Sequence, residues 1–406
     1  MSSGHVVRPR GADLDALLAS RLRRTLSDGV LDHRIATVVL DDGFAQWTVE
    51  LDRGRGRVRR GAARQPTLVV RGQATVLADV VAGKASGVQA FLDGDVTIRG
   101  DLGLSLQLDG LFGDATDTDE RPEQFPRARV AEVMGVRTAY LEAGPRDAPP
   151  VLMLHGLGAT NASLLPCLAD LARDHRVVAP DLPGFGNSTA PSAPYSPAWF
   201  AAWVEALQHK VEMRQAVLLG NSLGGRIALE QALTHPRSVT GLALLTPSPA
   251  FRRLRQLVPM VRLLRPELGS MPLRLNHGLV VEAVRAMFSD PDRLPKSWYD
   301  AAADECVRVF RSRAHRVAFF ASARQIFLEE AHGRYGFWDR LPGLAPPAVF
   351  VWGDRDRLVP STFAAHVADA LPDAGSIVLE DCGHVPQFEH PEETMAIVRG
   401  FLAQLT

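Results

Sequence analysis

One serine, Ser222, stands between two glycines in the pattern G-x-S-x-G at residues 220–224. An apolar run at 216–219 precedes this pattern, and a helical pattern at 226–233 follows it. A tight strand-to-helix turn brings neighbouring backbone close together, so only residues without a Cβ fit beside the serine. The pattern therefore predicts a turn that presents the hydroxyl of Ser222 beside the N–H groups and the positive dipole end of a helix.

A serine hydroxyl is a poor nucleophile at neutral pH, and it needs a histidine base whose tautomer is held by a carboxylate. Both side chains follow in the sequence. Residues 351–360 (VWGDRDRLVP) contain Asp354 and Asp356, and residues 382–388 (CGHVPQF) contain His384. The order of serine, aspartate and histidine predicts a catalytic triad, and it leaves both aspartates open as the acid.

These residues all follow apolar runs, in a region that begins near residue 145. Short apolar runs alternate there with longer amphipathic stretches, which is typical of a parallel sheet with crossover helices. Because the runs are uniformly apolar, we expect both faces of the sheet to be covered. The predicted strands are residues 151–154, 177–179, 216–219, 242–245, 348–351 and 377–379.

Residues 246–345 interrupt this alternation with helical patterns, notably at 279–288 and 317–327. Open α/β sheets bind ligands along the carboxyl edge of their strands, so helices inserted there are expected to form a cap over the site. Residues 251–265 mix arginines with leucine, valine and methionine. We expect a cap helix with its apolar face over the site, and the alternative is peripheral contact with a membrane.

These motifs, in this order, resemble the α/β-hydrolase family with a helical cap, over about residues 130–406. The resemblance implies Ser222 as the nucleophile and His384, in the pattern G-H-x-P, as the base. The family's loop pattern W-G-x-x-D-x-x-x-P implies Asp356 as the acid, which leaves Asp354 to fix the loop. A serine at position 222 argues against epoxide hydrolases and haloalkane dehalogenases, which are expected to carry a carboxylate there.

Residues 155–158 (HGLG) follow the first of these predicted strands and resemble the oxyanion loop of the same family. The resemblance implies that the backbone N–H groups of Leu157 and Leu223 form the oxyanion hole. Residues 181–188 (DLPGFGNS) match another family motif, which we interpret as a structural turn near the site.

The region before about residue 115 has a different pattern. It contains alternating segments typical of half-exposed strands, with one amphipathic stretch suited to a helix packed on a sheet. The predicted strands are residues 45–51, 67–70 and 95–99, and the predicted helix is 74–82.

Residues 92–101 (LDGDVTIRGD) and the leucines that follow them resemble the closing strand and helix of the sterol carrier protein type 2 domain. The resemblance covers about residues 10–113, and it implies an apolar tunnel for sterols, fatty acids or acyl-CoA. The alternative is a domain whose tunnel is filled with side chains and which serves as a docking surface. Leu102, Leu104, Leu106 and Leu108 cannot all face one side of a helix, so they do not decide between the two.

The composition excludes several classes of protein. Among 406 residues, Lys+Arg 45 and Asp+Glu 46 give a net charge of -1, so no overall field attracts nucleic acid. The three cysteines show no metal-ligand spacing, and no nucleotide or flavin motif is present, so we expect neither a metal nor a cofactor. The N-terminal residues lack the apolar core of a signal peptide, and we expect a cytoplasmic protein.

We therefore expect an α/β-hydrolase fold, with a mostly parallel sheet and a helical cap, fused to a smaller N-terminal α+β domain. The expected parts are a sterol-carrier-like domain (1–113), a linker (114–130), the hydrolase core (131–245 and 346–406) and the cap (246–345).

The expected function is that of a serine hydrolase, carboxylesterase-like or lipase-like, which cleaves an ester or thioester of a fatty acyl or sterol-like substrate through an acyl-enzyme. The alternatives are a carbon-carbon bond hydrolase of ring-fission products, an acyltransferase and a lipid carrier. Against carbon-carbon cleavage, Val385 stands where those enzymes tend to carry tryptophan.

Overall fold

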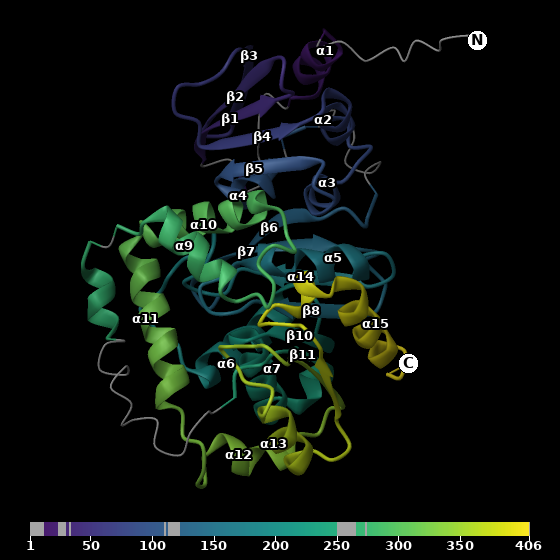
Figure 1. The fold of residues 1–406 in the computed structure, drawn as a ribbon, viewed down its shortest axis with the longest axis vertical. Helices are drawn as coiled ribbons and strands as arrows, with labels where there is room; N and C mark the ends of the chain where they lie inside the picture. The colour runs from purple at the N-terminus through teal and green to yellow at the C-terminus, as the bar shows by residue number, and fades with distance from the viewer. Residues whose placement is uncertain are drawn as a thin grey trace. The chain divides into compact units, whose positions relative to one another are not determined.

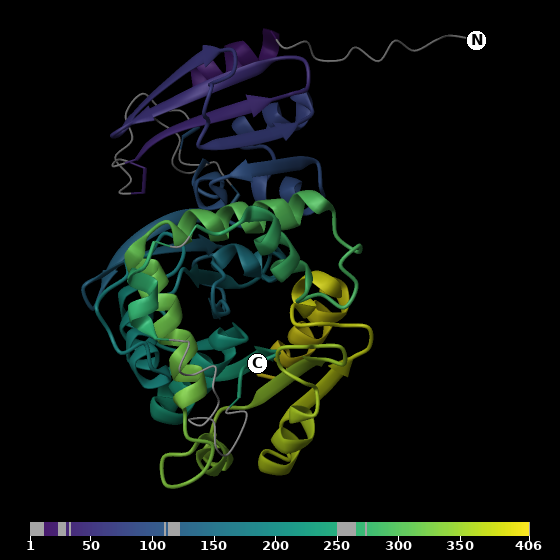
Figure 2. The same ribbon diagram turned by 60° about the vertical axis from the view of Figure 1, so that its left-hand side comes forward.

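The structure is a computed structural model. It describes residues 12–22, 30–31, 34–108, 111–112, 122–249, 265–272 and 274–405. The chain divides into two compact units, Met1–Arg129 and Val130–Thr406, which are drawn in Figures 1 and 2. Residues 114–121 of the expected linker lie outside the described residues, and strand β6 (Arg127–Val133) begins within its last residues.

The first unit is built on a five-stranded sheet. Its strand order is β3-β2-β1-β4-β5, with β1 and β4 parallel and the other pairs antiparallel. Three of the strands fall within one or two residues of the predicted segments, whereas β1 and β3 were not predicted. The strands are β1 (Ile35–Asp41), β2 (Gln46–Asp52), β3 (Arg55–Arg60), β4 (Leu68–Gly72) and β5 (Val96–Gly100).

Helices complete the core of this unit. They are α1 (Ala12–Arg21), α2 (Ala74–Val81), α3 (Gly87–Leu92) and α4 (Leu102–Ser105). Helix α4 ends after a single turn, so the leucines from 102 onward need not share one helix face. Leu102, Leu104 and Leu106 are all buried for this reason. Leu104, Leu68 and Val49 have no exposed surface, which leaves no water-sized gap beside them.

The second unit contains an eight-stranded sheet in the order β13-β12-β11-β10-β8-β9-β7-β6. The six predicted strands are present and pair in parallel, and β7 runs antiparallel to β9. The remaining strands are β7 (Val136–Ala143), β8 (Pro150–Leu154), β9 (Arg176–Pro180), β10 (Ala216–Asn221), β11 (Val239–Leu245), β12 (Ala348–Gly353) and β13 (Gly375–Leu379).

Strands β8 to β12 are buried on both faces, as their uniform apolarity predicted. The same prediction was wrong for β13, where the side chain of Val378 is 44% exposed. Strand β13 is the edge strand of the sheet, so it has a strand neighbour on one side only.

Helices of the core and of the cap surround this sheet (Figure 1). The core helices are α5 (Leu165–Leu171), α6 (Pro197–Lys210), α7 (Leu223–Thr234), α13 (Phe363–Ala370), α14 (Pro386–Glu389) and α15 (Pro391–Leu402). The cap contains a 3-10 turn at Pro266–Ser270 and helices α9 (His277–Arg285), α10 (Lys296–Phe310), α11 (Arg313–Leu328) and α12 (Phe337–Arg340).

The amphipathic stretch expected to contact either the site or a membrane lies almost entirely outside the described residues, because residues 250–264 are not described. Within the described ranges, the helices are too short or too polar to cross a bilayer.

Candidate active site

Ser222 occupies the turn between β10 and α7. Its backbone has φ 54° and ψ -116°, a conformation that L-residues rarely adopt. Two hydrogen bonds hold it, because Ser222 N–H donates to Leu245 O (3.1 Å) and Ser248 N–H donates to Ser222 O (3.0 Å). Strained backbone of this kind persists only where its surroundings enforce it, and it is concentrated at functional sites.

The glycines around Ser222 are required by close backbone packing, as the sequence predicted. A Cβ on Gly220 would lie 2.6 Å from the carbonyl carbon of Gly224, and a Cβ on Gly224 would overlap the carbonyl oxygen of Leu154. Glycine at 220 therefore lets the turn close on itself, and glycine at 224 lets it fit against the end of β8.

The structure brings His384 and Asp356 together. Nδ1 of His384 lies 2.7 Å from Oδ2 of Asp356, and both side chains are buried. The other oxygen, Oδ1, accepts hydrogen bonds from Leu358 N–H (2.7 Å) and Val359 N–H (2.9 Å), which fix the carboxylate plane. With its Nδ1 proton donated to the carboxylate, the imidazole keeps Nε2 free to accept a proton.

Asp354, the other candidate acid, does not contact His384. Its Oδ1 accepts a hydrogen bond from Cys382 N–H at 3.1 Å, and its residue is exposed. It therefore connects the end of β12 to the loop that carries the histidine.

Ser222 is linked to the histidine loop through its neighbour Asn221, a residue that sequence reasoning did not single out. The Asn221 amide Nδ2 donates to Leu245 O (3.1 Å), Thr246 Oγ1 (3.0 Å) and His384 O (3.3 Å). Thr246 Oγ1 also donates to His384 O at 2.9 Å. Within the described residues Ser222 and His384 share no direct side-chain hydrogen bond, which is common in enzymes without substrate.

The proposed oxyanion loop lies against the serine. A Cβ on Gly156 would be 3.2 Å from the Cβ of Ser222, so the chain entering Leu157 passes beside this serine. Leu223 is the first residue of α7, and its N–H therefore has no acceptor within the helix. The two residues predicted to donate therefore belong to chain segments that adjoin Ser222.

Two buried side chains, His155 and Asp181, hold the loops next to Ser222. His155 Nε2 accepts a hydrogen bond from Leu182 N–H (2.9 Å) and Nδ1 lies 2.8 Å from Gly156 O; burial lowers its pKa to about 4, so the ring is neutral near pH 7. Asp181 accepts from the N–H groups of Asn161 (2.9 Å) and Asn187 (2.8 Å), and burial raises its pKa to about 7. Asp181 therefore connects its own turn to the loop at Asn161.

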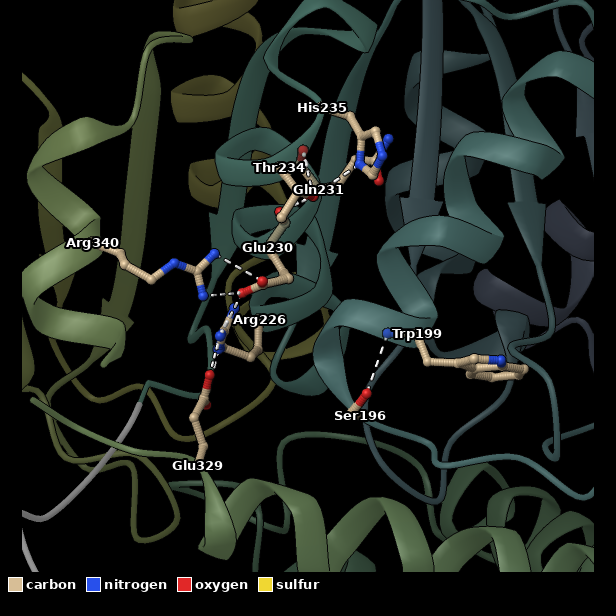
Figure 3. Close-up of polar contacts among 9 residues, drawn as sticks. All are labelled: Ser196, Trp199, Arg226, Glu230, Gln231, Thr234, His235, Glu329 and Arg340. Atoms are coloured by element: carbon tan, nitrogen blue, oxygen red, sulfur yellow. Dashed lines mark hydrogen bonds and ion pairs between the residues drawn. The ribbon is translucent and has the colours of Figure 1, made fainter. Parts of the chain in front are cut away.

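A buried ion cluster supports α7 behind the serine (Figure 3). Arg226 Nε donates to Glu329 (3.0 Å) and Nη2 to Glu230 (2.8 Å), while Arg340 Nη2 also donates to Glu230 (2.8 Å). The Arg226 guanidinium lies 4.7 Å from the centre of the Phe337 ring. Burial opposes ionisation of Glu230, but attraction to Arg226 and bonds from both arginines outweigh it and lower its pKa. The cluster joins α7 to the C-terminal part of the cap, at the end of α11 and at α12.

Cap helix α11 touches the oxyanion loop through an aromatic side chain. A Cβ on Gly158 would lie 3.0 Å from Cε2 of Phe319, so the ring covers this glycine. Phe319 also packs edge to face against Phe310 (5.0 Å between centroids) and Phe320 (5.6 Å). An aromatic group of the cap therefore packs on the loop that contains Leu157.

Metal ligands are not grouped here. The described part of the chain contains no cluster of three or more His, Cys, Asp or Glu side chains that could hold a metal ion.

Fold and site together define an α/β hydrolase. Residues 149–391 match the α/β hydrolase fold family, and the chain belongs to this family. Residues 15–113 match the SCP-2 sterol transfer family, so the N-terminal unit carries the predicted second domain.

The relatives include carbon-carbon bond hydrolases and esterases. The chain is 26% identical over 308 residues to 2-hydroxy-6-oxo-6-(2'-aminophenyl)hexa-2,4-dienoic acid hydrolase of Metapseudomonas resinovorans, covering 72% of this chain and 97% of the relative. It is 29% identical to pimeloyl-(acyl-carrier protein) methyl ester esterase of Aeromonas hydrophila, covering 63% and 96%. A solved membrane phospholipase A is 29% identical, with TM-score 0.57, covering 69% of this chain and 86% of that one.

Proposed function

We propose that this protein is a serine hydrolase that cleaves an ester or thioester with an apolar acyl group. Ser222 attacks the carbonyl carbon, and His384 takes the hydroxyl proton at Nε2. The N–H groups of Leu157 and Leu223 stabilise the oxyanion of the tetrahedral intermediate. His384 then protonates the leaving alcohol or thiol, and a water molecule activated by the same base releases the acid from the acyl-enzyme.

The hydrogen bond between Asp356 and His384 supports this mechanism, because it sets the tautomer that a general base requires. Asp356 donates no proton in this scheme. Its charge stabilises the imidazolium that forms when Ser222 loses its proton.

The single observation that carries the choice of an apolar substrate is the contact of Phe319 with Gly158. A group bound at the oxyanion hole lies beside an aromatic wall, where burial of apolar surface contributes about 25 cal/mol per Å². Relatives named as an esterase and as a phospholipase A are compatible with this class of substrate.

The N-terminal unit belongs to a family named for sterol transfer, and we propose that it serves the same apolar chemistry. Val49, Leu68 and Leu104 have no exposed surface, so other atoms of the unit pack against all three side chains. A lipid held by this unit must therefore lie away from these three residues.

The test is hydrolysis of an ester series from acetyl to palmitoyl by the full chain. We expect Ser222→Ala to abolish turnover, and Phe319→Ala to change kcat/KM for long acyl chains more than for acetate. Leu279→Ala, at a cap position with 72% exposure, is the matched control and should leave kcat/KM unchanged for both long acyl chains and acetate. Equal effects of Phe319→Ala on all chain lengths would contradict the apolar site.

The second candidate is hydrolysis of a carbon-carbon bond in a ring-fission product. It is favoured by the relative that carries this activity in its name and that the chain matches over 97% of its length. Against this candidate stands Val385, at the position where those enzymes tend to carry tryptophan; here the valine packs in an apolar cluster with cap residues. Turnover of a 2-hydroxy-6-oxo-dienoate, with no turnover of any ester, would replace the ester proposal.

A further inference from the structure

The loop that carries His384 is hydrogen-bonded on two opposite sides. Towards the sheet, Cys382 N–H donates to Asp354 Oδ1 (3.1 Å) and Arg355 N–H donates to Cys382 O (2.9 Å). Towards the cap, His384 N–H donates to Met287 O at 2.7 Å. Met287 belongs to the turn between cap helices α9 and α10, so the backbone of the proposed base is bonded directly to the cap.

Glu389 makes the second connection between this loop and the cap. Its side chain is buried, with Oε1 accepting from Gly383 N–H (2.8 Å) and Oε2 accepting from Ser289 N–H (2.7 Å). Arg293 donates to the Glu389 carbonyl oxygen at 3.1 Å. Hydrogen bonds to an ionised acceptor are about twice as strong as neutral ones, so one carboxylate holds both pieces of backbone together.

Apolar packing joins the same two segments. Phe388 packs edge to face on Trp298 of α10, with 5.6 Å between ring centroids. Gly383 has no room for a side chain, because a Cβ there would overlap Met287 O and lie 2.8 Å from Ser289 N. Val385, directly after the histidine, belongs to a buried cluster of the cap that also contains Val281, Phe288, Tyr299 and Ala303.

From these contacts we infer that helices α9 and α10 are the scaffold of the histidine loop and not a movable lid, and that Glu389 is the positioning residue that couples them. The inference rests on the proposed function, because it assigns a role to groups around His384. Any opening of the cap at α9 and α10 would break the Met287 and Ser289 bonds and displace the base. This half of the cap therefore stays in place during turnover.

Glu389→Gln tests the role of the carboxylate. An amide has one oxygen, so one of the two N–H donors faces an NH2 group and the loop shifts. A displacement of about 1 Å in such a site lowers the rate by about 100-fold. We expect kcat for a short-chain ester to fall by about 10- to 100-fold, with KM within about threefold of the parent. Glu393→Gln, which removes the same charge from a more exposed side chain of α15, should leave both constants unchanged.

Labelling of Ser222 by a fluorophosphonate separates positioning from folding. The serine oxygen attacks phosphorus, fluoride leaves, and His384 accepts the hydroxyl proton. The amplitude of labelling counts folded sites, and its rate reports the base. For Glu389→Gln in the full chain we expect an unchanged amplitude and a rate reduced by the same factor as kcat.

Trp298→Ala provides a second variant, on the cap side of the contact. A scaffold role predicts a lower kcat and labelling rate at constant KM for every acyl chain length. A lid role predicts instead that KM changes and that the change depends on chain length, and that result would overturn the inference. Labelling of Glu389→Gln at the parental rate would also overturn the inference. Failure of the parent protein itself to label or to turn over any ester would reject the proposed function, on which the inference rests.

Discussion

Replacing Asp356 with asparagine tests the proposed triad most directly, because the structure fixes which way the amide must point. In the parent, Oδ1 accepts two backbone N–H groups, from Leu358 and Val359, and Oδ2 accepts the Nδ1 proton of His384. In Asp356→Asn the amide oxygen must remain at the Oδ1 position, since an NH2 group there would face two donors. The NH2 group then points at Nδ1 of His384.

An imidazole that faces an NH2 donor must accept at Nδ1 and carry its proton on Nε2. Such a ring cannot take the proton of Ser222, so the general base is lost while the shape of the site is kept. In a comparable triad this change lowers kcat by about 10⁴-fold, which corresponds to about 5 kcal/mol of transition-state stabilisation. We expect a loss of this size in ester hydrolysis and in fluorophosphonate labelling, with the thermal midpoint within a few degrees of the parent.

Asp354→Asn is the matched control, because it removes the same charge two residues away. Its amide oxygen can still accept the hydrogen bond from Cys382, so we expect a change of less than about fivefold. A loss of less than tenfold for Asp356→Asn, or a larger loss for Asp354→Asn than for Asp356→Asn, would refute the assignment of Asp356 as the acid.

Three further predictions follow from the packing. Arg226→Met removes the buried partner of the Glu230 and Glu329 carboxylates. In urea titrations it should lower the free energy of unfolding by about 3–5 kcal/mol. The control Arg146→Met, at an exposed ion pair, should lower it by less than about 1 kcal/mol. Gly383→Ala should reduce kcat at least tenfold, because the new Cβ meets the cap backbone. Gly400→Ala is the control and should not reduce kcat, because the space around Gly400 is open. Equal kinetics of the two variants would show that the loop adapts. Burial lowers the pKa of His155 from 6.5 to about 4. Its contribution to the free energy of unfolding, about 3 kcal/mol, is therefore present above about pH 6.5 and lost as the pH falls through about 4. In urea unfolding at pH 7 and at pH 4, His155→Gln should lose less free energy of unfolding between the two pH values than the parent.

Local motifs with a mechanical reason were the part of the site that sequence could predict. The glycines beside Ser222 must fit against the end of a strand, and the acid and the base must each follow a strand, so short patterns indicate their roles. The same patterns could not reveal Asn221, whose amide reaches His384 across 163 residues of sequence. A contact of this kind depends on which strand ends meet, and no local pattern records that.

The strands of the fold were predictable where burial imposes an apolar run. Strand β3, with the sequence RGRVRR, shows no alternation of apolar and polar residues and was missed. It pairs with one neighbour at the edge of its sheet, where arginine side chains remain in water. The ion cluster of Arg226 and Glu329 was missed for another reason, since a charged residue in a helix is normally expected at the surface.

The order of the strands in the larger sheet has a consequence for the synthesis of the protein. Strands β10, β11, β12 and β13 stand side by side in the order in which the chain is made, so each has its inner neighbour already synthesised when it emerges. A ribosome delivers about 5–20 residues per second from the N-terminus, so Ser222 and its turn emerge long before the histidine loop. Under the proposed mechanism, the nascent chain holds Ser222 without its base until the C-terminal segment docks on the finished sheet.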